Sequence, residues 1–139
     1  GLQNSADAGL AAIAAKSIKE ASYHLHHARD WLVRMGDGTD ESHARVQAAV
    51  NHLMPYTEEF WTTSPAEGAA VAAHVAVDVW ALRPAWDAMV NDALAEATLS
   101  RPNFHGYVTE GKVGLHSEHL GFLLAEMQRL ARAHPDGRW

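Results

Sequence analysis

Apolar residues recur every three or four positions over most of the chain, which is the spacing of α-helices that pack on one side. The longest such stretch runs from about residue 8 to residue 35 and ends at the breaker cluster Gly36-Asp37-Gly38. Thr39 is then suited to be the N-cap of a second helix, which Pro55 is expected to bend or split.

Two more helices follow the same pattern. One is predicted from about Leu82 to Leu99, and the last from about Ser117 to Ala133, with Ser117 as its N-cap. An alanine-rich segment opens at Ser64-Pro65, and residues 100–115 are interpreted as an extended loop because they contain one proline and three glycines. The sequence therefore predicts an all-α chain.

Length and charge narrow the choice of partners. With 139 residues the chain is expected to form a single helical domain, 1–139, in which residues 1–9 are a linker. A net charge of -6 provides no basic surface for nucleic acid or for an anionic membrane, and no apolar run is long enough to span a bilayer. The absence of cysteine fits a cytoplasmic protein.

Glu20 and His24 are the most informative polar pair. They lie one turn apart on the first helix, at the edge of its apolar stripe, and are therefore expected to point toward the packed interior or its margin. Such a pair can share a metal ion or a hydrogen bond. The hydrogen bond is favoured, because a partly buried Glu is usually kept by a polar partner.

A di-iron helical bundle requires more ligands than this pair. It takes a Glu from each of two helices and a Glu-x-x-His from each of two others. No Glu in this sequence is followed by a His three positions later. The one Asp that has this spacing is in Asp40-x-x-His43, and Asp40 is better explained as a partner of the helix dipole. Glu20, His24 and His43 are thus vestigial candidates, too few for two metals. His116 and His119 could also pair, but no acid or third His accompanies them.

Bulky apolar residues indicate either a core or an interface. The five tryptophans are too many for a small helical chain to bury completely, and Trp is enriched at interfaces. The sequence leaves open which role applies to each of the five strongest packing or interface candidates, which are Trp31, Trp61, Trp86, Leu123 and Met127.

Two long segments resemble a known family. AAIAAKSIKEASYHLHHARDWLVRMGDGTDES and the tail GLHSEHLGFLLAEMQRLARAHPDGRW, which ends at Trp139, resemble the C subunits of phenylacetyl-CoA 1,2-epoxidase, an oxygenase complex of aerobic phenylacetate breakdown. The resemblance runs from about Ala11 to the end, and it implies that the chain is the C-terminal half of a longer one. It also implies a ferritin-like four-helix bundle, of which the first two helices here would supply the second pair.

The resemblance implies a role as well. In that family the A subunit holds the di-iron site and epoxidises the substrate ring, whereas the C subunit is structural and supports it. The chain is then expected to be a non-catalytic subunit with no cofactor of its own, paired with the A subunit. Two alternatives remain open. It could be a catalytic di-metal oxygenase whose other ligands lie on an N-terminal half, or a module that forms a homo-oligomer.

Overall fold

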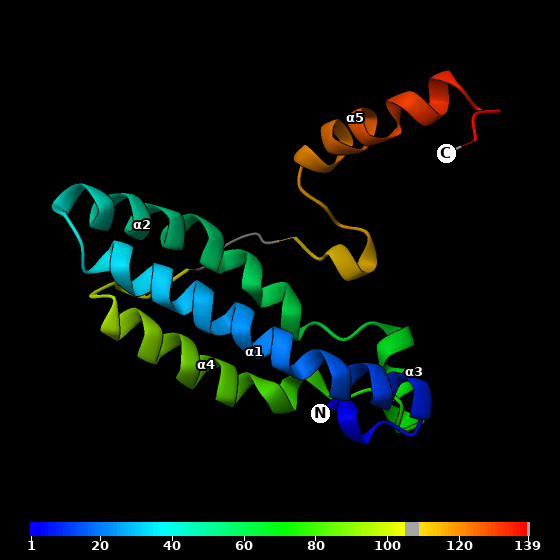
Figure 1. Ribbon diagram of the computed structural model, residues 1–139, viewed down its shortest axis with the longest axis horizontal. Coiled ribbons are helices and arrows are strands. Elements are labelled where there is room, and N and C mark those ends of the chain that lie inside the picture. Colours follow the sequence, from blue (N-terminus) through cyan, green and yellow to red (C-terminus); the bar gives the residue numbers. More distant parts are fainter. Residues whose placement is uncertain (105–108, 139) are drawn as a thin grey trace.

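The computed structural model describes residues 1–104 and 109–138, and within them the chain is all-α, as predicted. Three helices lie side by side with α1 (Ala8–Gly36) in the middle, α2 (Asp40–Leu53) along one flank and α4 (Val79–Glu96) along the other (Figure 1). All-helical packing of this kind is the expected architecture of the ferritin-like family.

Side-chain caps set where the helices begin. Asp7 accepts a hydrogen bond from the Leu10 amide at the start of α1, and Thr39 accepts one from the Ser42 amide at the start of α2. Ser64 opens α3 (Pro65–Ala72) with a reciprocal capping box. Each cap satisfies amide groups that the first helical turn leaves without partners, so these boundaries follow from local sequence.

Pro55 splits the second helix, as predicted. α2 ends at Leu53, and the 3-10 helix η2 (Met54–Trp61) follows it. The reason is that proline cannot donate the amide hydrogen bond that would continue an α-helix.

Three predicted boundaries were wrong. α4 begins at Val79 rather than at Leu82, because Asp78 caps it by accepting from the Trp80 amide, and it ends at Glu96 rather than at Leu99. α5 (His119–Ala133) begins two residues after Ser117, and the Ser117 side chain does not cap it. Among its described residues, the predicted loop over 100–115 contains one 3-10 turn, η3 (Gly111–Val113), and Gly106 lies outside the described residues.

The opening residues, predicted as a linker, form a turn and contact other parts of the chain. Leu2–Asn4 form a 3-10 turn, η1, that packs against α1. The Ser5 hydroxyl donates to the Val75 carbonyl at 2.7 Å, and the Ala6 amide donates to the His74 carbonyl at 2.9 Å. These bonds tie the N-terminus to the segment that follows α3 (Figure 1).

α1, α2 and the end of α4 come together at Gly36. A Cβ on Gly36 would press on the carbonyl oxygen of Ala97 and lie 2.9 Å from the Ala97 Cβ, so only glycine permits this approach of α1 to the end of α4. The Gly36 carbonyl also accepts from His43 Nδ1 at 2.8 Å and from the Thr98 hydroxyl at 3.3 Å. The core is centred beside this junction, on Leu94, Ala97 and Leu99.

The described residues bury little apolar surface for a chain of this size. Six apolar side chains are buried: Pro55, Trp61, Ala93, Leu94, Ala97 and Leu99. The accessible surface is 10325 Å², whereas a compact monomer of 15.1 kDa would expose about 7,100 Å². No described helix is both long enough and apolar enough to cross a bilayer.

We expect Gly36→Ala to lower the free energy of unfolding by about 1–3 kcal/mol, because the added methyl group forces α1 away from Ala97. Urea unfolding followed by circular dichroism measures this. Gly68→Ala in α3 is the matched control, since a Cβ there meets nothing within 4 Å. A Gly36→Ala chain as stable as the control would contradict the packing described at this junction.

Candidate functional site

Glu20 and His24 do not point into the interior of the described chain. The Glu20 side chain is 78% exposed and that of His24 is 68% exposed, and their closest charged atoms are 3.9 Å apart. The packed side of α1 is instead the side of Arg29, which donates to Asp92 at 2.7 Å and to Glu96 at 2.5 Å on α4. The nine residues from Glu20 to Arg29 turn the helix by about half a revolution, so the predicted pair lies on the opposite face.

His43 lies at a different place on the fold. It is half-buried at the inner edge of α2, as the sequence predicted, and its Nδ1 bonds the carbonyl of Gly36. Twelve residues separate Gly36 from His24, or about 18 Å along the helix axis. The three vestigial candidates are therefore not brought together. Within residues 1–104 and 109–138, no three His, Asp or Glu side chains are close enough to share a metal ion.

Glu59 organises a polar cluster between η2 and the segment before α5. Its carboxylate accepts from the Thr109 hydroxyl at 2.9 Å and from the Gly111 amide at 3.1 Å. His116, one of the two paired histidines considered from the sequence, lies beside it and borders with His119 a surface pocket of about 450 Å³. Glu59 is thus used as a hydrogen-bond acceptor that holds the chain in place.

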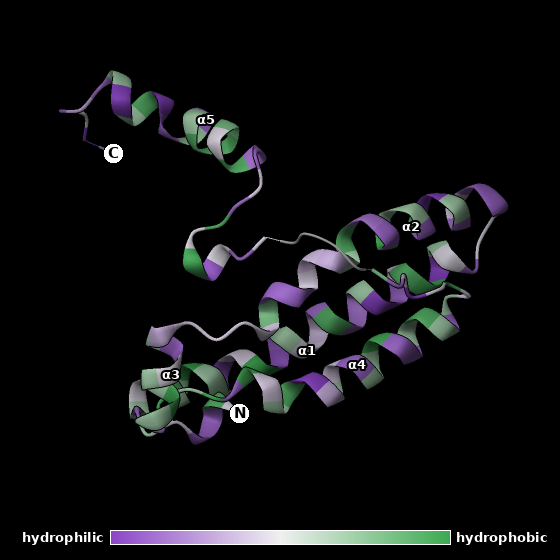
Figure 2. Cartoon of the chain, turned by 180° about the vertical axis from the view of Figure 1, so that it is seen from behind, coloured by the Kyte–Doolittle hydropathy of each residue, from purple (hydrophilic) through white to green (hydrophobic). Residues whose placement is uncertain are grey.

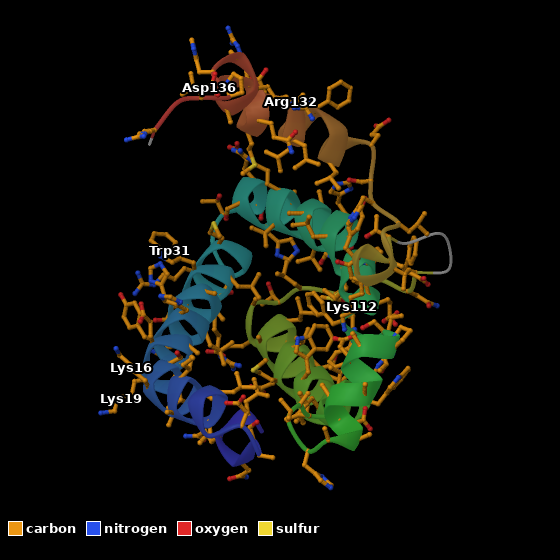
Figure 3. The ribbon with its side chains drawn as sticks, turned by 90° about the vertical axis from the view of Figure 1, so that its right-hand side faces the viewer. Lys16, Lys19, Trp31, Lys112, Arg132 and Asp136 are labelled. Carbon is orange, nitrogen blue, oxygen red and sulfur yellow. The ribbon has the colours of Figure 1, made fainter. Side chains whose placement is uncertain are left out.

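Lys112 completes this cluster, which we call the 59–112 clamp (Glu59, Glu67, Thr109, Gly111 and Lys112). Its ammonium group donates to the carbonyl oxygens of Phe60 and Thr62 and lies 2.9 Å from the Glu67 carboxylate. Figure 3 shows Lys112 reaching in among the other side chains rather than out to solvent. The clamp therefore ties the base of α5 to η2 and α3.

The clamp shifts the titration of its two carboxylates. The backbone amide of Ser64, together with Lys112 and the Ser64 hydroxyl, lowers the pKa of Glu67 to about 2. The Gly111 amide and the Thr109 hydroxyl lower the pKa of Glu59. Hydrogen bonds to the charged form are the main cause in both cases, because they favour ionisation.

We expect Glu67→Gln to destabilise the chain at pH 7 and to have a diminishing effect as the pH falls from 4.5 to about 2. A carboxylate whose folded pKa is depressed contributes stability above its unfolded pKa and loses it as the pH falls through the folded value. Urea midpoints of both chains across this pH range measure the difference. A difference that did not change with pH would contradict the stated role of Glu67.

The structure separates core from surface among the five bulky candidates. Trp61 is 5% exposed and meets the half-buried Trp86 edge to face, with ring centroids 5.3 Å apart. Trp31, Leu123 and Met127 are exposed. Trp61 and Trp86 therefore pack inside the chain, whereas the other three are available to partners.

Trp31 belongs to a continuous aromatic row on the outer side of α1, which we call the aromatic face (Tyr23, His27, Trp31 and Arg34). The rings of Tyr23 and His27 stack with centroids 6.1 Å apart, His27 meets Trp31 edge to face, and the Arg34 guanidinium lies 5.8 Å from the Trp31 ring centroid. All four side chains are exposed, and Trp31 points away from the other helices (Figure 3). Tyr, Trp and Arg are the residues most enriched at interface hot spots.

Sequence reasoning missed the ion pairs that hold α4. The Asp87 carboxylate accepts from Arg101 at 2.6 Å and lies 3.6 Å from the Arg83 guanidinium. The Arg101 guanidinium lies over the Trp86 ring, and the Arg83 guanidinium lies over the Trp61 ring. Arg83 and Asp87 have the spacing of a helical pair and could have been found. The partners of Glu59 and Lys112 are about 50 residues away in sequence, so no local pattern marks them.

Comparison with known proteins identifies a relative and a family. The chain is 48% identical over 138 residues to a protein of Escherichia coli (strain K12) that is described as the C subunit of 1,2-phenylacetyl-CoA epoxidase. The match covers 99% of this chain and 56% of that relative, so the chain spans little more than half of the relative's length. The model of the family "Phenylacetic acid catabolic protein" matches residues 1–139. The chain therefore belongs to the phenylacetic acid catabolic protein family.

Proposed function

We propose that the chain acts as a structural subunit of a phenylacetyl-CoA epoxidase, binding a catalytic subunit and holding no metal itself. In this role it works in the cytoplasm, next to a partner whose di-iron site epoxidises the ring of phenylacetyl-CoA. Its 48% identity to the C subunit of such an epoxidase supports the assignment to that complex.

The separation of the candidate ligands carries the proposal of a non-catalytic role. Two iron ions in a helical bundle need carboxylates and imidazoles that converge on one point. Here Glu20 and His24 lie on the exposed side of α1, while His43 is bonded at the far end of the same helix. Among the described residues, no three His, Asp or Glu side chains lie close enough together to hold a metal ion.

The aromatic face supports the proposed pairing. Interface hot spots are enriched in tryptophan, tyrosine and arginine, and the aromatic side chains among them lose little conformational entropy when they are ordered. The aromatic face has this composition and is exposed over about three turns of α1. Through it the chain would hold the catalytic subunit rigid and help to exclude bulk water from the partner's site.

We expect Trp31→Ala to weaken binding to the catalytic subunit by about 30-fold or more, as loss of an interface hot spot does. The same change should leave the unfolding free energy nearly unchanged, because Trp31 is 49% exposed. Trp61→Ala, in the core, should instead lose about 3–5 kcal/mol of stability. Calorimetric titration and urea unfolding measure the two effects. Arg45→Ala on α2 is the control, since its side chain is 80% exposed.

Metal content and turnover test the non-catalytic role directly. The purified protein should bind iron or manganese only substoichiometrically.

Glu20→Ala should leave turnover of the reconstituted complex nearly unchanged, because Glu20 contacts no reacting group under this proposal. Two tightly held metals per chain, or loss of turnover with assembly intact, would favour the alternative of a catalytic di-metal oxygenase.

A further inference from the structure

Two Asp-Gly pairs occur in this chain, Asp37-Gly38 and Asp136-Gly137. In such a pair the glycine nitrogen can attack the side-chain carboxyl carbon of the aspartate, because glycine has no side chain to obstruct the approach. The first pair lies between two packed helices, and the second lies in an exposed turn. The two pairs are therefore expected to differ in reactivity.

The attack closes a succinimide ring with loss of water. A bond forms between the glycine nitrogen and the aspartate Cγ, and a Cγ–O bond breaks. The oxygen leaves as water, taking the amide proton and the proton of the carboxylic acid. Water then opens the ring at either carbonyl. One opening restores aspartate, and the other gives isoaspartate, whose backbone runs through Cγ and whose original backbone carbonyl carbon has become a free carboxylate.

Ring closure requires rotation about the Cα–C bond of the aspartate, which turns the glycine nitrogen toward Cγ. The same rotation moves the chain after the pair relative to the chain before it. Hydrogen bonds that span the pair therefore resist the reaction, whereas a pair in a turn that opens readily is free to react.

Hydrogen bonds span the pair Asp37-Gly38, which connects α1 to α2. The Ser42 hydroxyl of α2 donates to the Met35 carbonyl of α1 at 2.8 Å. His43 Nδ1 of α2 donates to the Gly36 carbonyl of α1, also at 2.8 Å. Rotation at the first pair would swing α2 away from α1 and break both bonds, so the folded chain protects this pair.

The turn that holds Asp136-Gly137 has no such bonds. It follows α5 at the end farther from the packed helices, and hydrophilic residues predominate there (Figures 2 and 3). All of residues 133–138 are exposed, and the Gly137 amide donates to the His134 carbonyl at 3.0 Å. Within the described part of the chain, no hydrogen bond joins residues 135–138 to a helix other than α5. Rotation at Asp136 therefore breaks one exposed bond, which water replaces.

We propose that Asp136 is a site of isoaspartate formation in the folded chain and that Asp37 is not. The product lengthens the backbone by one carbon between α5 and Arg138 and exposes a new carboxylate. Isoaspartyl methyltransferases esterify such a carboxylate with the methyl group of S-adenosylmethionine, so the modified chain is a substrate for that class of enzyme. The modification does not depend on the proposed function.

Peptide mapping tests the selectivity, because trypsin releases the two pairs in separate peptides, 35–45 and 133–138. After incubation of the folded chain at neutral pH, peptide 133–138 should contain a form of unchanged mass that endoproteinase Asp-N no longer cleaves at Asp136. Peptide 35–45 should keep aspartate at position 37. Equal accumulation in the two peptides, or none in peptide 133–138, would overturn the proposal.

Unfolding the chain in guanidinium chloride is the control for the role of structure. The rate at Asp37 should then rise roughly tenfold or more, because the two bonds that span the first pair no longer have to be broken. The rate at Asp136 should change much less. An unchanged rate at Asp37 would show that the fold does not protect it and would contradict the proposal.

Methyl transfer from labelled S-adenosylmethionine, catalysed by an isoaspartyl methyltransferase, gives a second readout. The incubated chain should take up label, and Asp136→Glu should abolish most of it, because the longer side chain would have to close a larger and less favourable ring. Asp37→Glu is the matched control and should keep the label. Label that survives Asp136→Glu, or that is lost in Asp37→Glu, would place the isoaspartate elsewhere and overturn the assignment.

Discussion

The close approach of α1 to the end of α4 at Gly36 is the contact on which the fold depends. Only the absence of a side chain at Gly36 lets the Ala97 backbone lie against α1, and the Gly36 carbonyl then holds both His43 and Thr98. The buried residues Leu94, Ala97 and Leu99 are gathered at this end. Apart from Gly36, no other residue of α1 is buried.

Local sequence predicts where the helices of this fold lie better than it predicts which residues surround them. The start of α2 and the break after Leu53 follow from Thr39 and Pro55, because caps and prolines act on the nearest turns. The start of α4 was placed too late because its cap, Asp78, precedes the apolar pattern that marks the helix. The amphipathic pattern of α5 identified the helix correctly, but a pattern cannot say whether the apolar side is covered.

In the candidate site, too, the sequence predicts the local arrangement of residues but not their tertiary surroundings. A helical wheel correctly grouped Glu20 with His24, yet it cannot say which side of the helix a neighbour covers. That side is determined by Arg29, whose partners Asp92 and Glu96 are more than 60 residues away. Likewise, Trp31 and Trp61 are equivalent in sequence, and only the packing of Trp86 and Arg83 against Trp61 distinguishes them.

The small core has a consequence for how the protein is maintained in the cell. With six buried apolar side chains among its described residues, the chain gains little stability from its own packing. Any partner that binds only the folded form raises that stability by mass action, so folding and assembly become one coupled equilibrium. Copies made in excess of their partners spend more time unfolded and are removed by proteases. Under the proposed function, the amount of this protein would follow the supply of its partners, which would keep the ratio of subunits balanced without a separate control.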